Sequence, residues 1–192
     1  MSDRHTQILD AAVRVIAQDG VRGLRIEKLA AVASVSTALI YYHFNDRAGV
    51  LRAALDHINR RAQNYTDQPL SDARDPRVRV EQMLLCELQD SEEVRETSVA
   101  WGELRASAVF HADLREPLCA TTQAWNTDVE ELIRAGQQAG RVACGIDAAA
   151  AAVRLTALVE GISDRWHSGS LTLGRARELL TGAIKLELDT ER

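Results

Sequence analysis

The sequence predicts an all-α fold of about nine helices, and three of its features support this class. Almost every apolar segment repeats at a spacing of three to four residues, which places the side chains on one face of a helix. No segment shows the alternation of apolar and polar residues, bounded by turns, that is typical of a strand. Serine, aspartate or asparagine stands just before several of the periodic segments, where such residues cap helices.

Three helices are expected before residue 47. The first presents an apolar face that consists of Ile8, Ala12, Val15 and Ile16. Gly20 can end this helix in a left-handed conformation. A second helix is expected at about residues 26–32 and a third at about 36–43, with Ser36 as its N-cap. Ser34 occupies the turn between them, where a positive φ would suit glycine better.

Six further helices are expected in the rest of the chain. The fourth begins at an Asn45-Asp46 cap and reaches about Tyr65. The stretch "TDQPLSDARDP", residues 66–76, holds two of the three prolines and is expected to be a linker. Capping residues mark the starts of the next four helices, namely Asp75, Ser91, Asp113 and Asp147. The last helix lies within residues 170–188.

Charge is distributed unevenly along the chain. Residues 1–62 carry nine Lys and Arg against six Asp and Glu, a net charge of +3, whereas residues 63–192 carry a net charge of −8. A mildly basic N-terminal part on an acidic remainder suggests that only the N-terminal part meets a polyanion.

Several classes of protein are disfavoured by the sequence. No apolar run approaches the roughly 20 residues of a membrane span. Cys86, Cys119 and Cys144 fit no metal-ligand spacing and are expected to be reduced packing residues in a cytoplasmic protein. There is also no nucleophile elbow, no glycine-rich phosphate loop and no cluster of metal ligands. We therefore expect no catalytic residues, no metal and no cofactor.

The stretch "VSTALIYYHF", residues 35–44, is unusually aromatic for this chain. Two short helices joined by about three residues, on a longer first helix, make a helix-turn-helix unit. Ile40 and Phe44 are four residues apart and can share the inward face, so at least one of Tyr41 and Tyr42 should be exposed. An exposed tyrosine hydroxyl can bond a DNA phosphate. The alternative, that both tyrosines are half-buried packing residues, remains open.

The segment "LRIEKLAAVASVSTALIYYHFNDRAGVL" resembles the DNA-binding segment of the TetR family of bacterial transcriptional regulators, and the resemblance covers about residues 8–55. The residues that carry it are Leu29-Ala30, Ala33, Val35-Ser36, Ile40-Tyr41-Tyr42-His43-Phe44 and Arg47. Three positions depart from the family pattern. Ser34 replaces a turn glycine, Arg25 stands where a capping threonine is common, and Arg47 replaces a frequent lysine.

The resemblance implies a DNA-binding domain at residues 1–46 and an effector-binding and dimerisation domain at residues 47–192. It implies base-edge contacts from Thr37, Ala38 and Leu39. It implies phosphate contacts from Arg25, Tyr41, Tyr42, His43 and Arg47. Ser36 completes the set of predicted DNA-binding residues. Since few of the base readers are polar, part of the specificity is expected to come from DNA shape.

The C-terminal part resembles the BetI-like subset of the same family, on the stretches "WGELRASAVFHADLREPL" and "VACGIDAAAAAVRLTALVEGISDRWHSG". This resemblance implies a ligand pocket among helices four to seven and dimerisation through the last two helices. The eighth helix is apolar nearly all round, and the ninth has an apolar stripe of Leu173, Ala176, Leu180, Ile184 and Leu188. A two-fold four-helix interface would cover these surfaces. Burial of both helices against their own chain is the alternative.

Tryptophans and carboxylates supply the candidate ligand-binding residues. They are Trp101, Glu103, Trp125, Glu160, Asp164 and Trp166. A buried carboxylate beside a tryptophan ring suits a cationic amine, because charge pairing and the cation–π interaction both favour it. A flat apolar or aromatic effector, or no effector, remains open.

The sequence thus predicts a homodimeric, ligand-responsive transcriptional regulator and favours a repressor. It would bind double-stranded DNA at a palindromic operator and be released by a small molecule, with Arg47 and its helix linking the pocket to DNA. The alternative is a helical small-molecule-binding or scaffolding protein that no longer reads DNA. Steep salt dependence of DNA binding would distinguish the two.

Overall fold

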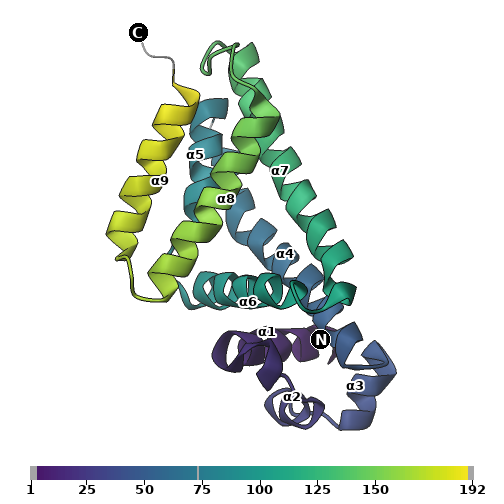
Figure 1. Ribbon diagram of the computed structural model, residues 1–192. Coiled ribbons are helices and arrows are strands. Elements are labelled where there is room, and N and C mark those ends of the chain that lie inside the picture. Colours follow the sequence, from purple (N-terminus) through teal and green to yellow (C-terminus); the bar gives the residue numbers. More distant parts are fainter. Residues whose placement is uncertain (1–3, 73, 190–192) are drawn as a thin grey trace. The chain divides into compact units, whose positions relative to one another are not determined.

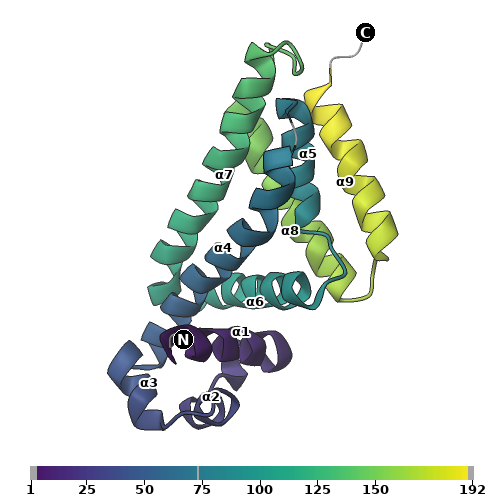
Figure 2. The same ribbon diagram turned by 180° about the vertical axis from the view of Figure 1, so that it is seen from behind.

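The computed structural model describes residues 4–72 and 74–189, without the side chains of residues 67–72. In this part of the chain nine α-helices and one short 3-10 helix form, and no strand does (Figures 1 and 2). The predicted all-α fold is therefore confirmed. The chain divides into two compact units, which are described in turn. The first unit is Met1–Arg61 with Glu96–Thr121, and the second is Ala62–Arg95 with Thr122–Arg192.

The first unit is built on α1 (Arg4–Gly23), α2 (Ile26–Val32) and α3 (Thr37–Phe44). It also contains the start of α4 (Arg47–Asp72), most of α6 (Glu92–Ala108), the 3-10 helix η1 (Ala112–Leu114) and the start of α7 (Arg115–Gln138). Gly20 breaks α1 with a φ of 71°, as its predicted role requires, and one further turn follows the break. The face predicted for the first helix is fully buried, as are Leu29 and Ile40 from the two short helices.

The turn between α2 and α3 has the predicted conformation. Ser34 adopts a φ of 53°, in the left-handed region that glycine occupies more easily. Ser36 caps α3, since its hydroxyl accepts the Leu39 N–H at 3.2 Å. Ile40 and Phe44 are buried, so they form the inward face of α3.

The turn between α3 and α4 depends on one glycine. Asn45 has a φ of 64°, and the Asp46 carboxylate accepts the Gly49 N–H at 2.6 Å, which confirms the predicted cap. A Cβ atom on Gly49 would lie 1.9 Å from the Phe44 carbonyl oxygen. Because that contact is with backbone, no side-chain rotation could relieve it.

The second unit is built on α5 (Pro76–Cys86), α8 (Ala148–His167) and α9 (Leu173–Leu188), with the remainders of α4, α6 and α7. Both views show α5, α8 and α9 side by side (Figures 1 and 2). The core is mainly aliphatic and includes Val80, Leu84, Leu132, Ile133, Leu155, Val159 and Leu180. The Arg177 guanidinium fastens α9 to the end of α5 by donating to the carbonyl oxygens of Leu85 and Leu88, at 3.2 and 2.6 Å.

Three expectations about these elements were wrong. Residues 66–72 of the predicted linker continue α4, because a proline removes one backbone donor but does not by itself end a helix. The seventh helix begins at Arg115, after a separate 3-10 turn that contains Asp113. All three cysteines are free, but only Cys86 is buried; Cys119 and Cys144 are exposed and are not packing residues. The domain boundary between residues 46 and 47 stays a prediction.

Candidate functional site

The outer face of α3 is exposed. Thr37 and Ala38 are exposed in its first turn, and Leu39 is half-buried. Tyr41 is 48% and Tyr42 79% exposed. The prediction that at least one tyrosine faces outward is therefore confirmed for both. The outer face of this short helix therefore carries several exposed hydroxyl groups, whereas its inward face packs in the core.

Both ends of α2 are held by side chains from α1 and α4. The side-chain amide of Gln7 on α1 donates to the Ala33 carbonyl oxygen at 2.9 Å, at the end of α2. Arg47, at the start of α4, donates from Nε to the Leu24 carbonyl oxygen at 2.7 Å and from Nη2 to that of Val21. Arg47 thus clamps the connection between α1 and α2. A phosphate contact from the same residue stays a prediction.

Arg25 is the N-cap residue of α2, which is the position expected from its replacement of a capping threonine. Its side chain makes no capping hydrogen bond and is exposed. The guanidinium is therefore available to an anion. A phosphate contact from Arg25 stays a prediction.

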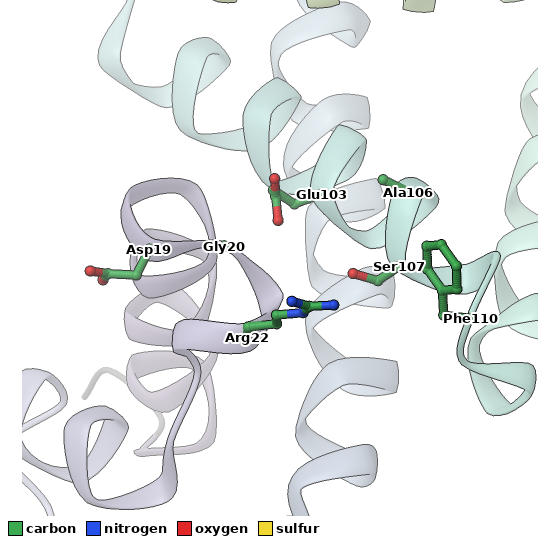
Figure 3. A pocket seen from close by; sticks show the side chains of 7 residues that line it. All are labelled: Asp19, Gly20, Arg22, Glu103, Ala106, Ser107 and Phe110. Carbon is green, nitrogen blue, oxygen red and sulfur yellow. The ribbon is translucent and has the colours of Figure 1, made fainter.

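A crevice of about 420 Å³ lies at the broken end of α1 in the first unit (Figure 3). Glu103 and Arg22 point into it, whereas Asp19 points away, toward its ion pair with Lys28 at 2.6 Å. The Glu103 carboxylate accepts the Val21 N–H at 3.2 Å. A Cβ atom on Gly20 would lie 2.8 Å from that carboxylate, so glycine permits the close approach. Glu103, predicted as a ligand-binding residue, therefore has a structural partner.

The six predicted ligand-binding residues divide between the two units. Trp101 and Glu103 belong to the first unit, and Trp125, Glu160, Asp164 and Trp166 belong to the second. Asp164 is exposed, Glu160 and Trp125 are half-buried and Trp166 is buried. Their joint role in binding an effector stays a prediction.

The ring of Trp166 already has a cation near it. The Arg95 guanidinium lies over the ring, 4.9 Å from its centroid. The ring of His167, the next residue in the chain, has its centroid 4.3 Å from that of Trp166. Burial, and after it the nearby Arg95 charge, lowers the pKa of His167. Both effects favour a neutral imidazole at this end of α8.

The pair of Tyr65 and Glu87 in the second unit was missed. The Tyr65 hydroxyl donates to the Glu87 carboxylate at 2.8 Å. Burial raises the pKa of Glu87 to about 7, although the Tyr65 hydrogen bond acts in the opposite direction. Burial, followed by the Glu87 charge, raises the pKa of Tyr65 well above its usual value. Among the described residues no cationic side chain forms an ion pair with Glu87, so its negative charge is poorly compensated.

One pattern in the sequence could have revealed this pair. Glu87 is the single charged residue in the run Leu84-Leu85-Cys86-Glu87-Leu88. A lone carboxylate in an apolar run at a helix end has few routes to solvent. Its partner Tyr65 could not be inferred, because the two lie 22 residues apart.

Neither metal binding nor membrane insertion is suggested by the described residues. Among them, no three histidine, cysteine, aspartate or glutamate side chains are grouped so that they could hold a metal ion. No helix in the described ranges combines the length and apolar character needed to cross a membrane.

Two parts of the chain match models of known protein families. Residues 8–54 match the model of the bacterial regulatory proteins of the tetR family, and residues 76–189 match that of the BetI-type transcriptional repressor C-terminal domain. The regulator BetI of Burkholderia ambifaria is 27% identical over 173 residues, which cover 89% of this chain and 84% of the relative.

Two solved structures resemble the whole chain. A TetR-family regulator from a Rhodococcus species is 45% identical, with a TM-score of 0.91 and coverage of 98% of this chain and 100% of that one. A transcriptional regulator from Saccharomonospora viridis, solved in complex with choline, is 26% identical, with a TM-score of 0.87 and full coverage of both chains. The chain therefore belongs to the TetR family of transcriptional regulators, with a C-terminal domain of the BetI type, and is a DNA-binding regulator rather than an enzyme.

Proposed function

We propose that this regulator is a homodimeric, cytoplasmic repressor that binds a palindromic operator and leaves it when a small organic cation binds. The observation that supports its DNA-binding role is the outer face of α3. Two tyrosines and the first-turn residues are exposed there, while the inward face of the helix is buried. The remaining parts concern the dimer and the effector, and each has its own support.

Operator recognition would rest on α3 lying in the major groove. Thr37 can form a hydrogen bond with a base edge, while Ala38 and Leu39 can contact only thymine methyl groups or shape. Tyr41, Tyr42 and the basic residues around them would bind phosphates and fix the register. With so little polar readout, we expect DNA deformability to contribute to specificity.

Apolar side chains left exposed on α8 and α9 support the dimer. The apolar stripe predicted on α9 is largely buried within its own unit, since Ala176, Leu180, Ile184 and Leu188 are all inaccessible. Other residues are left uncovered: Val153 is 51% and Leu186 88% exposed, and Leu179 is also exposed. A second copy related by a two-fold axis would cover both helices with one self-complementary patch.

The effector is proposed to be cationic because of Glu87. Glu87 is half-buried, and a partly desolvated carboxylate that lacks a cationic partner gains most from a ligand that brings the charge. The Tyr65 hydroxyl fixes one carboxylate oxygen and leaves the other to the ligand. The choline complex of the Saccharomonospora relative is consistent with a ligand of this class. A flat apolar or aromatic effector is the competing proposal, and it would not require Glu87.

Coupling between effector and DNA would run through α4, which contributes residues to both units. Arg47 ties the start of this helix to the connection between α1 and α2. A shift of α4 would therefore carry the DNA-binding head with it. Two heads that suit half-sites about 34–36 Å apart would no longer match the operator.

Selection of bound fragments from sheared genomic DNA, followed by sequencing, tests the DNA-binding proposal. We expect an enriched imperfect palindrome, bound with an affinity that falls steeply with salt because phosphate contacts release counterions. Recovery of no preferred sequence at low salt would contradict operator binding. A non-palindromic site would contradict the two-fold dimer.

Sedimentation of the purified protein tests the interface. Leu186→Glu should shift the protein toward monomer, because it places a charge in the apolar patch. Val109→Glu is the control, since Val109 is also exposed, at 64%, but lies in the turn after α6 in the first unit. A wild-type monomer, or equal effects of the two variants, would exclude this interface.

Release of operator by choline and by its neutral isostere 3,3-dimethylbutan-1-ol tests the effector class. A cation site predicts release by choline alone, and Glu87→Gln should weaken it at least tenfold. Release by both compounds would favour the apolar alternative. Release by neither would exclude quaternary ammonium compounds of this size.

A further inference from the structure

The crevice at the broken end of α1 has no part in the function proposed above. Its lining comes from the end of α1, the end of α6 and the turn that follows α6, and it includes Gly20, Arg22, Glu103, Ser107 and Phe110 (Figure 3). All of these residues belong to the first unit. Its volume of about 420 Å³ lies within the range of small-molecule pockets, on the order of 300–1,000 Å³. The crevice is therefore large enough for a small organic ligand.

The wall of the crevice carries two opposite charges. Arg22 and Glu103 both point into it (Figure 3). The third charged residue of the wall, Asp19, points away and pairs with Lys28 at 2.6 Å. Within the part of the chain that the structure describes, the exposed Arg22 side chain forms no hydrogen bond and no ion pair. Its guanidinium can therefore bind an anionic group of a ligand.

The Glu103 carboxylate is fixed by the backbone of α1 through one oxygen only. Its Oε2 accepts the Val21 N–H at 3.2 Å, and the missing Cβ at Gly20 leaves room for this approach. Its other oxygen, Oε1, accepts no hydrogen bond from the described residues. A carboxylate that is already held loses little side-chain freedom when a ligand binds. Oε1 is therefore a preorganised acceptor for a cationic group.

An exposed aromatic ring completes the wall. Phe110 is 82% exposed and follows Val109, which is 64% exposed. The backbone of this turn is held, because the Phe110 N–H donates to the Ser107 carbonyl oxygen at 3.0 Å. An apolar or aromatic group of a ligand that packs on the Phe110 ring would remove apolar surface from water.

We propose that this crevice is a second ligand site, which binds a free aromatic amino acid. The ligand's ammonium group donates to Oε1 of Glu103, its carboxylate accepts from the Arg22 guanidinium, and its side chain packs on Phe110. This site lies in the first unit, whereas the effector site proposed around Glu87 lies in the second. The inference does not depend on operator binding or on the identity of that effector.

The charges of the wall select the class of ligand. A simple anion would be attracted by Arg22 but repelled by Glu103, and for a simple cation the two effects are reversed. A neutral compound would partly desolvate both charges and pair with neither. A zwitterion pairs with both, and a guanidinium can donate two parallel hydrogen bonds to its carboxylate. Because the charged groups remain partly exposed, we expect weak binding, with a Kd of about 0.1–1 mM.

Isothermal titration calorimetry of the full-length protein tests this inference, with L-phenylalanine, L-tyrosine and L-tryptophan as probes. At least one of them should bind with the expected Kd. The amide of that amino acid lacks the carboxylate and its N-acetyl derivative lacks the ammonium group, so each should bind at least about fivefold more weakly. Absence of binding by all three amino acids up to about 10 mM would overturn the proposal. Equal binding of a parent compound and either derivative would also overturn it.

Substitutions locate the site. Arg22→Gln should weaken binding at least about fivefold and Phe110→Ala at least about threefold, and both change exposed side chains, so folding should be preserved. Arg52→Gln is the matched control, since Arg52 is also exposed in the first unit and forms no ion pair among the described residues. It should bind like wild type.

The outcomes for the two ligand sites are distinguishable. An amino acid that binds wild type, Arg22→Gln and Phe110→Ala equally well does not occupy the crevice, and this result would overturn the inference while leaving the proposed function intact. Equal losses in Arg22→Gln and Arg52→Gln would show only a general effect of net charge and would overturn it as well. Failure of operator selection or of release by choline would leave these calorimetric results unaffected.

Discussion

Tyr42 and Tyr65 show how differently the two units use the same side chain. In the first unit Tyr42 carries its hydroxyl outward on α3, with no partner needed from the core. In the second unit Tyr65 turns its hydroxyl inward, to a carboxylate 22 residues away. The first arrangement follows from helical spacing over ten residues. The second depends on how helices far apart in sequence pack together. We expect effector chemistry to vary in regions of this second kind.

Gly49→Ala should have the largest effect. It tests whether the fold of the helix-turn-helix depends on contacts between residues close in sequence. The new Cβ would meet the Phe44 carbonyl oxygen, so the turn between α3 and α4 must open. We expect a loss of about 2–4 kcal/mol in the free energy of unfolding, together with loss of operator binding. Urea denaturation measures the first quantity. Gly174→Ala is the control, because a Cβ there meets nothing within 4 Å; similar losses in both variants would refute the explanation.

Glu87→Gln tests the environment of the Tyr65–Glu87 pair through the pH dependence of stability. Because burial raises the pKa of Glu87 to about 7, the folded chain retains a proton that the unfolded chain loses at lower pH. Stability must therefore fall as the pH rises from about 4.5 to about 7. Glutamine cannot ionise, so the variant should be more stable than wild type by about 1–3 kcal/mol at pH 8 but not at pH 5.

Urea denaturation at pH 5, 6.5 and 8 measures this difference. Glu178→Gln, on the exposed side of α9, should follow the wild-type pH dependence. If Glu87→Gln has the same pH slope as wild type, the carboxyl group is not buried in the way described.

Ser36→Ala should have a smaller, purely local effect. Removing the hydroxyl leaves the Leu39 N–H without its cap, at a cost of about 1 kcal/mol. Thermal unfolding measures this loss, and Ser36→Asp should restore stability because a carboxylate also caps. Equal stability of the alanine and aspartate variants would show that the cap does not matter.

Ser34→Gly should give the smallest change, and a gain. Its φ of 53° is strained for serine and ordinary for glycine, so we expect stabilisation of about 0.5–1 kcal/mol. Calorimetry would show this as a small rise in Tm. Ser34→Ala keeps the strain and should not stabilise; a gain from alanine would point to the hydroxyl rather than the backbone.

The helix-turn-helix could be predicted almost completely from sequence. The inward pair Ile40 and Phe44, the Ser36 cap and the positive φ at Ser34 all depend on residues within a few positions of one another. Local propensity was misleading at the predicted linker. The proline in residues 66–72 suggested a linker, yet α4 continues through it.

The candidate effector residues were harder to predict for the same reason. Composition drew attention to tryptophans and carboxylates, but Glu103 is used by the Val21 N–H and Trp166 already has Arg95 over its ring. Glu87 was overlooked because its importance comes from burial and from Tyr65. Neither property is visible in a local pattern.

Because α3 is short, its outer surface is difficult to transfer to a peptide or to another protein. It has eight residues, whereas isolated helices shorter than about 12–15 residues are marginal in water. A synthetic peptide that copies α3 would be mostly unfolded and would compete poorly for DNA unless it were chemically stapled. Grafting its outer residues onto another scaffold would likewise have to bring a substitute for the Gln7 contact and a capping residue. The practical unit for engineering a new specificity is therefore the three-helix head rather than the helix.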